Sequence, residues 1–178
     1  MKGILFRDEM ITAIREGRKT QTRRVIKELG EPDAWWVVAV FLDGKVRFAN
    51  RKDDRDITVF TRYRIGETVY VKETWATENK YNHLKPSEIP KRARLWDLAD
   101  VNYNPQVMGR VRSPLFMPEW AARTFIKILD VQPQRIREMT KEDAEAEGEP
   151  FMPLPEKGTL LDFGYTKPYC YQIEHFVY

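Results

Sequence analysis

The segment that most constrains the fold is residues 34–48. Residues 34–42 are dense in β-branched and aromatic side chains, and Asp43-Gly44 follows them directly. This dipeptide between two apolar runs is a strong signal for a tight hairpin turn. Residues 45–48 then alternate polar and apolar side chains, as a half-buried strand does. The sequence therefore predicts an antiparallel hairpin here.

The rest of the chain is rich in strand patterns and poor in helix patterns. Apolar or alternating runs predict further strands at about 2–6, 57–61, 68–73, 120–131 and 169–178. A short helix is expected with Asp8 as its cap and Gly17 at its end, and a second one capped by Thr140 and ended by Gly148. Strands and helices do not alternate as they would in a doubly wound fold. We therefore expect an α+β fold with a mostly antiparallel, barrel-like sheet flanked by short helices.

Residues 79–112 interrupt the strand pattern with prolines at 86, 90 and 105 and with scattered charges. The one regular element they suggest is a short helix near 91–98. We expect one domain over residues 1–178, because this length is usual for a single core, with 79–112 as a long insertion. Such long loops are often where binding surfaces lie.

Composition excludes several classes of protein. With 42% hydrophobic and 32% charged residues the chain is globular rather than disordered. No segment approaches the roughly 20 apolar residues that a spanning helix needs, so we expect a cytoplasmic protein with no membrane partner. One cysteine excludes an internal disulfide, and with only two histidines the chain offers too few ligands for a structural zinc site. We expect no metal and no cofactor. The net charge of +3 permits a polyanionic partner without requiring one.

The basic stretch 16–24 carries the first candidate chemistry. Lys19 and Thr22 follow the predicted end of the first helix, so an ammonium and a hydroxyl come close together among other cations. A nearby positive charge disfavours protonation of a lysine, and such a lysine can take a proton from a hydroxyl. The stretch thus fits an activated nucleophile. It also fits a solvated basic turn that contacts a phosphate or nothing.

The acidic helix near 140–148 is the electrostatic complement of this stretch. Most of its carboxylates are expected only to keep the helix solvated. Glu147 differs, because it precedes Gly148 at the helix end, where the helix dipole opposes a negative charge. That position favours the protonated form, which suits a proton donor.

Two further sets of residues fit nucleic acid. An exposed tryptophan can stack on a base, although core packing is the more common role of this residue. Basic clusters at 91–94 and 110–112 fit phosphate contacts as well as a solvated face. The tryptophans are Trp35, Trp36, Trp75, Trp96 and Trp120.

Three segments carry a resemblance to a known family. Gly17, Lys19, Thr22 and Arg24 match the spacing of the N-terminal signature of the ASCH domain, a member of the PUA-like superfamily. Residues 63–75 resemble its turn with glycine and an acidic residue followed by a strand. Residues 117–121 followed by 140–148 are similar to phage-encoded and prophage-encoded ASCH proteins. The insertion and the part after 149 are not covered.

The resemblance implies a small β-barrel flanked by helices, with a cleft between the Gly17 loop and the late acidic helix. Some bacterial ASCH proteins are amidohydrolases that remove the acetyl group from N4-acetylcytidine. Matching their motif positions makes Lys19 the proton acceptor, Thr22 the nucleophile and Glu147 the proton donor. The substrate contacts expected from the same motifs are Gly17, Arg18, Arg24, Glu73 and Trp75.

Other functions remain open. Lys19 and Arg24 suit phosphate contacts equally well, so the same basic cleft fits a non-catalytic module that binds RNA or a modified nucleotide. A ribonuclease, or a phage assembly or host-interaction protein, is a further alternative. One fold hosts many functions, so the fold does not decide among them.

Overall fold

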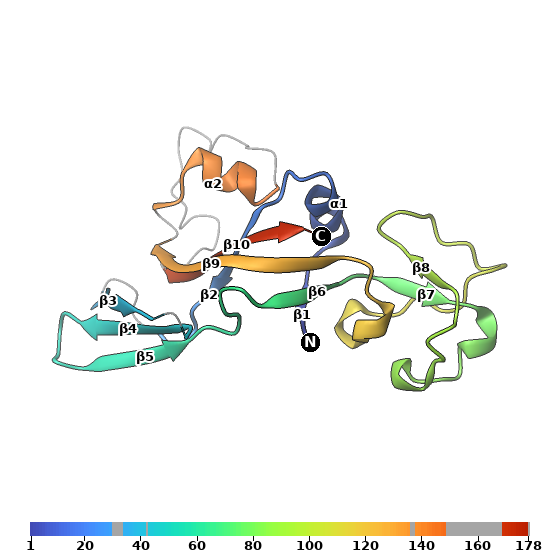
Figure 1. The fold of residues 1–178 in the computed structure, drawn as a ribbon, viewed down its shortest axis with the longest axis horizontal. Coiled ribbons are helices and arrows are strands. Elements are labelled where there is room, and N and C mark those ends of the chain that lie inside the picture. The colour runs from blue at the N-terminus through green and yellow to red at the C-terminus, as the bar shows by residue number, and fades with distance from the viewer. Residues whose placement is uncertain (30–33, 42, 136–137, 149–168, 178) are drawn as a thin grey trace. The chain divides into compact units, whose positions relative to one another are not determined.

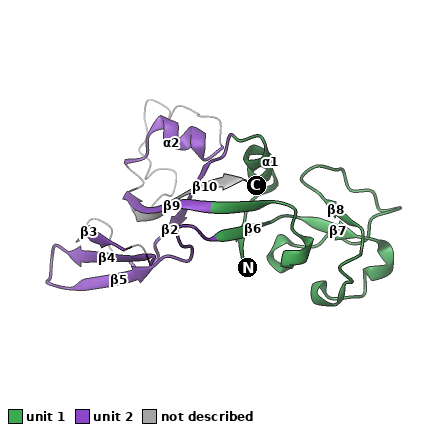
Figure 2. Cartoon of the chain, viewed as in Figure 1, with its two compact units in different colours: residues 1–17, 68–127, 177–178 green, residues 18–67, 128–176 purple. Residues whose placement is uncertain are grey.

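The computed structural model describes residues 1–29, 34–41, 43–135, 138–148 and 169–177, the last of these by its backbone only (Figure 1). The chain divides into two compact units. Unit 1 comprises residues 1–17, 68–127 and 177–178, and unit 2 comprises residues 18–67 and 128–176 (Figure 2).

Unit 1 contains a short sheet and a long excursion. Strand β1 (Lys2–Leu5) pairs in parallel with β6 (Thr68–Lys72), and β6 pairs antiparallel with the beginning of β9 (Phe125–Arg135). Strands β7 (Trp75–Thr77) and β8 (Leu95–Asp97) form a separate antiparallel pair. The helices are α1 (Asp8–Arg15) and the 3-10 turns η2 (Asn79–Tyr81), η3 (Pro86–Glu88), η4 (Pro114–Phe116) and η5 (Glu119–Ala121).

Helix α1 forms where the sequence predicts it. Ile11 and Ile14, on one face of the helix, are buried. The residue that caps the helix is Arg7, with no side-chain hydrogen bond, so the expectation that Asp8 would be the cap is wrong. Asp8 instead occupies the first turn, where its negative charge is favourable. Gly17 follows the helix with a φ of 73°, a conformation that glycine adopts without strain.

The core of unit 1 gathers around Trp75, which has no exposed surface. Ile89, Ala93, Met117 and Ala121 pack against it. Trp120 meets the Trp75 ring edge to face, with ring centroids 6.4 Å apart and an interplanar angle of 88°. The segment 79–112 thus contributes its own side chains to this core.

Unit 2 contains the predicted hairpin. Strands β3 (Trp35–Val40), β4 (Lys45–Asn50) and β5 (Asp56–Phe60) form a three-stranded antiparallel sheet in that order. Gly44 has a φ of 85°, and a Cβ there would lie 2.6 Å from Thr61 Oγ1, so the turn requires glycine. The remaining elements are β2 (Gln21–Val25), most of β9, helix α2 (Lys141–Ala146) and β10 (Tyr169–Val177), and β10 pairs antiparallel with β2.

The described chain is therefore α+β, with two α-helices and strands mostly in antiparallel sheets. The parallel pair β1–β6 is the exception. The expected helix near 91–98 is wrong, because Leu95 and Asp97 pair with Thr77 and Trp75 as strand β8. That long-range pairing outweighs the weak local helix preference. Within the described residues, no helix has both the length and the apolar character needed to cross a membrane.

Candidate functional site

Lys19 lies immediately before β2, and its side chain is completely buried in unit 2. Its Nζ donates to the Gln21 carbonyl oxygen at 2.7 Å and to the Glu147 carbonyl oxygen at 2.7 Å. It also donates to Glu147 Oε2 at 2.9 Å, across 128 positions of sequence. An ammonium group has three protons, and these three acceptors match them. The structure thus brings together the predicted proton acceptor and the predicted proton donor.

Local structure at the ends of α2 positions Glu147. Thr140 Oγ1 accepts from the Asp143 backbone N–H at 3.2 Å, and Asp143 Oδ2 accepts from the Thr140 N–H at 3.1 Å. This capping box starts the helix as the sequence predicts. Glu147 is the C-cap, and Gly148 follows with a φ of 84°. The Thr20 N–H donates to the Ala146 carbonyl oxygen at 2.8 Å, which ties the helix end to the chain entering β2.

Arg23, on β2, is a second cation at the same carboxylate. Its Nη1 lies 3.1 Å from Glu147 Oε1, its Nη2 lies 2.9 Å from Asp143 Oδ1, and its Nε donates to Gln134 Oε1 at 2.8 Å. We call Lys19, Arg23, Gln134, Asp143 and Glu147 the Lys19 cluster. Its two cations and two carboxylates balance in charge, which makes their burial tolerable.

The electrostatics of the cluster favour the ionised form of Asp143. Burial raises the pKa of Asp143, but hydrogen bonds from Thr140, Gln134 and Arg23 outweigh burial and hold that pKa below its usual value. Glu147 receives one cation on each carboxylate oxygen. The side chains of Arg23, Asp143 and Glu147 are 9%, 15% and 17% exposed, so solvent screens these pairs only weakly.

Thr22, the predicted nucleophile, is a buried residue of β2 whose backbone partner is Ile173 of β10. Side chains alternate along a strand, so Thr22 faces away from the side of β2 on which Gln21 and Arg23 contact each other. Among the described residues, its hydroxyl makes no hydrogen bond to Lys19 or Glu147. The structure therefore joins two of the three predicted catalytic groups.

The other substrate-contact candidates divide between the units. Gly17 ends α1 in unit 1. In unit 2, Arg18 is exposed and its Nη1 donates to the Gly148 carbonyl oxygen at 3.2 Å, at the same helix end that holds Glu147. Arg24 is exposed near the end of β2. Both arginines thus present charge to solvent on the chain segments that form the Lys19 cluster.

Glu73 and Trp75 lie in unit 1, and both are fully buried. Arg123 binds the Glu73 carboxylate through two hydrogen bonds, from Nε at 3.1 Å and from Nη2 at 2.7 Å. Trp75 forms the centre of the unit 1 core, and the Arg112 guanidinium lies 5.6 Å from its ring centroid. In this unit both side chains serve packing and charge pairing, and their part in substrate binding stays a prediction.

Arg123 gathers further carboxylates into what we call the Arg123 network. Its Nε lies 3.0 Å from Asp97 Oδ2, and it also pairs with Asp100, which in turn pairs with Arg15. Burial, followed by the nearby charge of Glu73, raises the pKa of Asp97 to about 6. Oδ1 of Asp97 is buried without a hydrogen-bond partner among the described residues. The ionised form of Asp97 is therefore the unfavourable one.

Replacing Asp97 with asparagine is expected to stabilise the protein at pH 8 and to have little effect at pH 4. The native state holds the Asp97 proton more tightly than the unfolded chain does, so this carboxyl stabilises the fold below about pH 4, and the stabilisation is lost as the pH rises through about 6. The gain at pH 8 should be about 1–2 kcal/mol. Urea unfolding at both pH values measures it. Asp54→Asn, at an exposed position, is the control, and an equal gain from the two substitutions would contradict the argument.

Asp143, Arg23 and Arg123 are among the groups of the two charged sites that sequence reasoning missed. Asp143 belongs to the acidic helix recognised as the complement of the basic stretch, but nothing in its spacing distinguishes it from its neighbours. Arg23 stands inside that basic stretch without matching a position of the signature. Arg123 carries no sequence signal at all, since its three carboxylate partners come from distant segments.

Comparison of the chain with models of protein families, with curated proteins and with solved structures gives no match in any of the three. The ASCH resemblance consequently stands on the sequence motifs and their order. The geometry of the Lys19 cluster is independent of it.

Proposed function

We propose that this protein is an amidohydrolase that removes the acyl group from an N4-acylated cytidine-type nucleoside or nucleotide. The observation that supports this proposal is the hydrogen bond of 2.9 Å between Lys19 Nζ and Glu147 Oε2. It joins two groups that the sequence assigns to proton transfer, and it does so in a site with little solvent.

The pair supplies both proton-transfer groups in one step. When the proton moves from Lys19 Nζ to Glu147 Oε2, the lysine becomes a neutral amine and the glutamate a carboxylic acid. The amine then accepts the Thr22 proton while Thr22 Oγ1 attacks the acyl carbonyl carbon. The bond from that carbon to N4 breaks, and Glu147 donates its proton to N4. These two proton transfers restore the ammonium and the carboxylate. Water then hydrolyses the acyl-threonine ester, which releases the carboxylic acid and the free Thr22 hydroxyl.

The remaining features of the proposal follow from the resemblance. Arg24 orients the base or the developing oxyanion, and Arg18 lies beside the helix end that carries Glu147. The proposed fold is a PUA-like barrel of the ASCH type, acting in the cytoplasm. Arg23 Nη1, at 3.1 Å from Glu147 Oε1, holds the carboxylate in place beside Lys19.

The test is hydrolysis of N4-acetylcytidine, followed by the absorbance change as cytidine forms. We expect Thr22→Val, which keeps the side-chain shape, and Glu147→Gln each to lower kcat by about 10²–10⁴-fold, the usual contribution of a general acid–base group. The matched controls are Thr20→Val and Glu145→Gln, at exposed positions of the same two segments. These should retain activity within about twofold.

Circular dichroism of each variant shows whether the fold is kept. If the wild type hydrolyses the substrate and a folded Thr22→Val variant does so as well, Thr22 has no part in the mechanism. Absence of turnover in the wild type with N4-acetylcytidine and its nucleotide would overturn the hydrolase.

A second function, a non-catalytic RNA-binding or modified-nucleotide-binding module, is favoured by one specific observation. The Lys19 ammonium already donates to the Gln21 and Glu147 carbonyl oxygens and to Glu147 Oε2, and Thr22 faces away from the Arg23 side of β2. In this case Lys19 is a structural cation and the exposed Arg18 and Arg24 contact phosphate. Binding of a single-stranded RNA would then persist in Thr22→Val, and Arg18→Gln with Arg24→Gln would lower the slope of log K against log salt by about 1.4.

A further inference from the structure

The five tryptophans differ in how much of the ring is available to stack on a base. Trp35 and Trp75 are buried. The Arg94 and Arg51 guanidinium groups lie over the rings of Trp96 and Trp36, at 4.9 and 5.6 Å from the ring centroids. Trp120 is partly exposed, is held edge to face by Trp75, and lines a cavity of unit 1. A ring that is fixed in place and borders a cavity is suited to contact a planar ligand.

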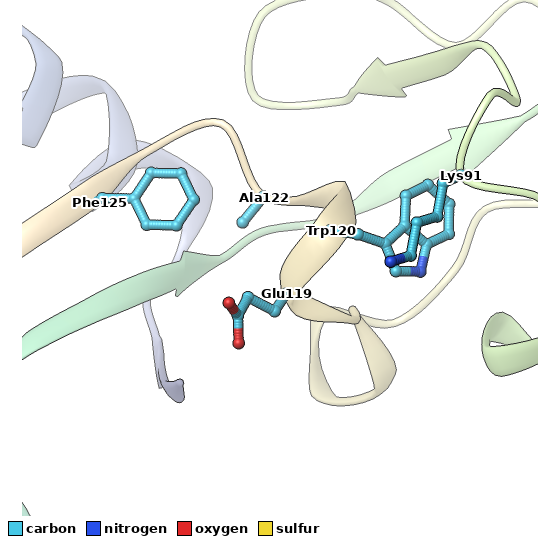
Figure 3. A pocket seen from close by; sticks show the side chains of 5 residues that line it. All are labelled: Lys91, Glu119, Trp120, Ala122 and Phe125. Atoms are coloured by element: carbon cyan, nitrogen blue, oxygen red, sulfur yellow. The ribbon is translucent and has the colours of Figure 1, made fainter.

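This cavity has a volume of about 510 Å³ and is lined by Lys91, Glu119, Trp120, Ala122 and Phe125. Its size lies within the roughly 300–1,000 Å³ of small-molecule sites. Figure 3 shows Phe125 on one side of the small Ala122 side chain, and Trp120 with Lys91 on the other. The Glu119 carboxylate lies on the Phe125 side, away from the Lys91 amino group. The cavity therefore offers aromatic surface with opposite charges at its two ends.

Two cations beside the cavity have no partner among the described residues. Lys91 lines it, Arg92 is the next residue, and both are exposed. Neither makes an ion pair, hydrogen bond or ring contact within the part of the chain that the structure describes. The neighbouring arginines differ, because Arg94 covers Trp96, and Arg112 is buried and donates to the Tyr81 and Leu84 carbonyl oxygens. Arg110 is exposed but donates to the Leu84 carbonyl oxygen at 3.1 Å, so among the described residues of the two basic clusters Lys91 and Arg92 are the cations without such a contact.

One carboxylate oxygen is also available at the other end of the cavity. Glu119 Oε2 lies 2.5 Å from the amino group of Met1. Its Oε1 has no hydrogen-bond partner among the described residues, and the side chain is 48% exposed. A carboxylate oxygen accepts only, so it selects a ligand with an N–H or O–H donor at that end.

The geometry points to a nucleotide-binding site in this cavity, for a nucleotide either free or within single-stranded RNA. The base lies over Ala122 in contact with the aromatic rings and directs an N–H group toward Glu119. The phosphate pairs with Lys91 and Arg92. Charge distribution supports an anionic ligand, since residues 79–112 hold seven Lys or Arg and three Asp or Glu, while the whole chain has a net charge of only +3. This inference involves unit 1 alone and does not depend on the hydrolase.

The test measures binding of a fluorescein-labelled single-stranded RNA octamer by anisotropy, with CMP and cytidine as competitors. Lys91→Gln with Arg92→Gln is expected to weaken binding at least about tenfold at 50 mM salt and to lower the salt slope by about 1.4, since each phosphate contact contributes about 0.7. Ala122→Leu, which narrows the cavity, should weaken binding by about five- to hundredfold, the range for a lost base–aromatic contact. CMP should compete and cytidine should not.

The matched control is Lys80→Gln with Arg94→Gln, which removes the same charge from exposed positions of the same segment. It should change binding less than about twofold. Equal weakening by both double variants would show a non-specific attraction and overturn the site, as would an undetectable affinity for both RNA and CMP at millimolar concentration. Competition by CMP with little binding of the octamer would identify the free nucleotide as the ligand. Thr22→Val should leave this binding intact while abolishing turnover, so the two proposals fail separately.

Discussion

Replacing Lys19 with methionine is expected to lower the free energy of unfolding by about 3–5 kcal/mol, as breaking one partner of a buried ion pair does. The side chain is fully buried, and its three acceptors are the Gln21 and Glu147 carbonyl oxygens and Glu147 Oε2. Methionine fills a similar volume but donates no hydrogen bond. The substitution therefore removes one donor from each of two carbonyl groups and leaves Glu147 with Arg23 as its remaining cation.

Urea unfolding of four proteins measures this effect: the wild type, Lys19→Met, Glu147→Gln and the double variant. If the ion pair carries the effect, the double variant should be more stable than the sum of the single losses predicts, by about 1–3 kcal/mol. Lys141→Met is the control, because the Lys141 side chain is 59% exposed and its pair with Glu145, at 3.7 Å, lies at the surface. A loss below about 1 kcal/mol for Lys19→Met would contradict the geometry of the cluster.

Replacing Arg123 with methionine is expected to have an effect of similar size in unit 1. The Glu73 carboxylate has no exposed surface and receives two hydrogen bonds from Arg123. Without them it is a buried charge whose principal cation is gone, which costs about 3–5 kcal/mol. Asp97 and Asp100 also lose a partner, and their mutual repulsion with Glu73 adds to the loss.

Thermal or urea unfolding at pH 8 tests this prediction. Adding Glu73→Gln to Arg123→Met should recover part of the stability, because the buried negative charge is removed together with its partner. Lys80→Met is the control, since Lys80 pairs with Glu78 at the surface with a side chain that is 62% exposed. Arg123→Met should also raise the pKa of Asp97 further. A variant as stable as the wild type at pH 8 would show that Arg123 does not neutralise this network.

The two buried charged sites differ in what they offer to chemistry. In the Lys19 cluster each carboxylate oxygen of Glu147 faces a different cation, so a proton can be exchanged with Lys19 while Arg23 holds the carboxylate in place. In the Arg123 network one guanidinium is shared by Glu73, Asp97 and Asp100. Neutralising any one of these carboxylates therefore reduces the electrostatic repulsion on the other two. The first arrangement suits proton transfer and the second suits charge balance within a core.

Local sequence determined much of the secondary structure. The Asp43-Gly44 turn places β3 against β4, and the alternation after Arg64-Ile65-Gly66 becomes β6. Thr124, Ile126 and Ile128 are buried along one face, as their spacing predicts. These features depend on backbone conformation and side-chain period, which a few neighbouring residues specify.

Part of the candidate site was also visible in the sequence. Lys19 and Glu147 carry individual signals, one from a glycine-containing basic stretch and the other from a helix end before Gly148. Their meeting at 2.9 Å was expected only through the family resemblance. The helix over 91–98, by contrast, was predicted wrongly, because strand pairing with residues 75–77 decides that segment.

Sequence alone thus determined the α+β class, the hairpin, the capped helix α2 and the residue types of a proton-transfer pair. Only the tertiary structure decided that Arg23 rather than Thr22 shares Glu147 with Lys19 and that Glu73 is buried on Arg123. It also decided that Lys91 and Arg92 have no partner within the described part of the chain. The physical reason is that ion pairs and cavities join segments far apart along the chain. Their energy depends on burial and distance, which no local pattern of residues encodes.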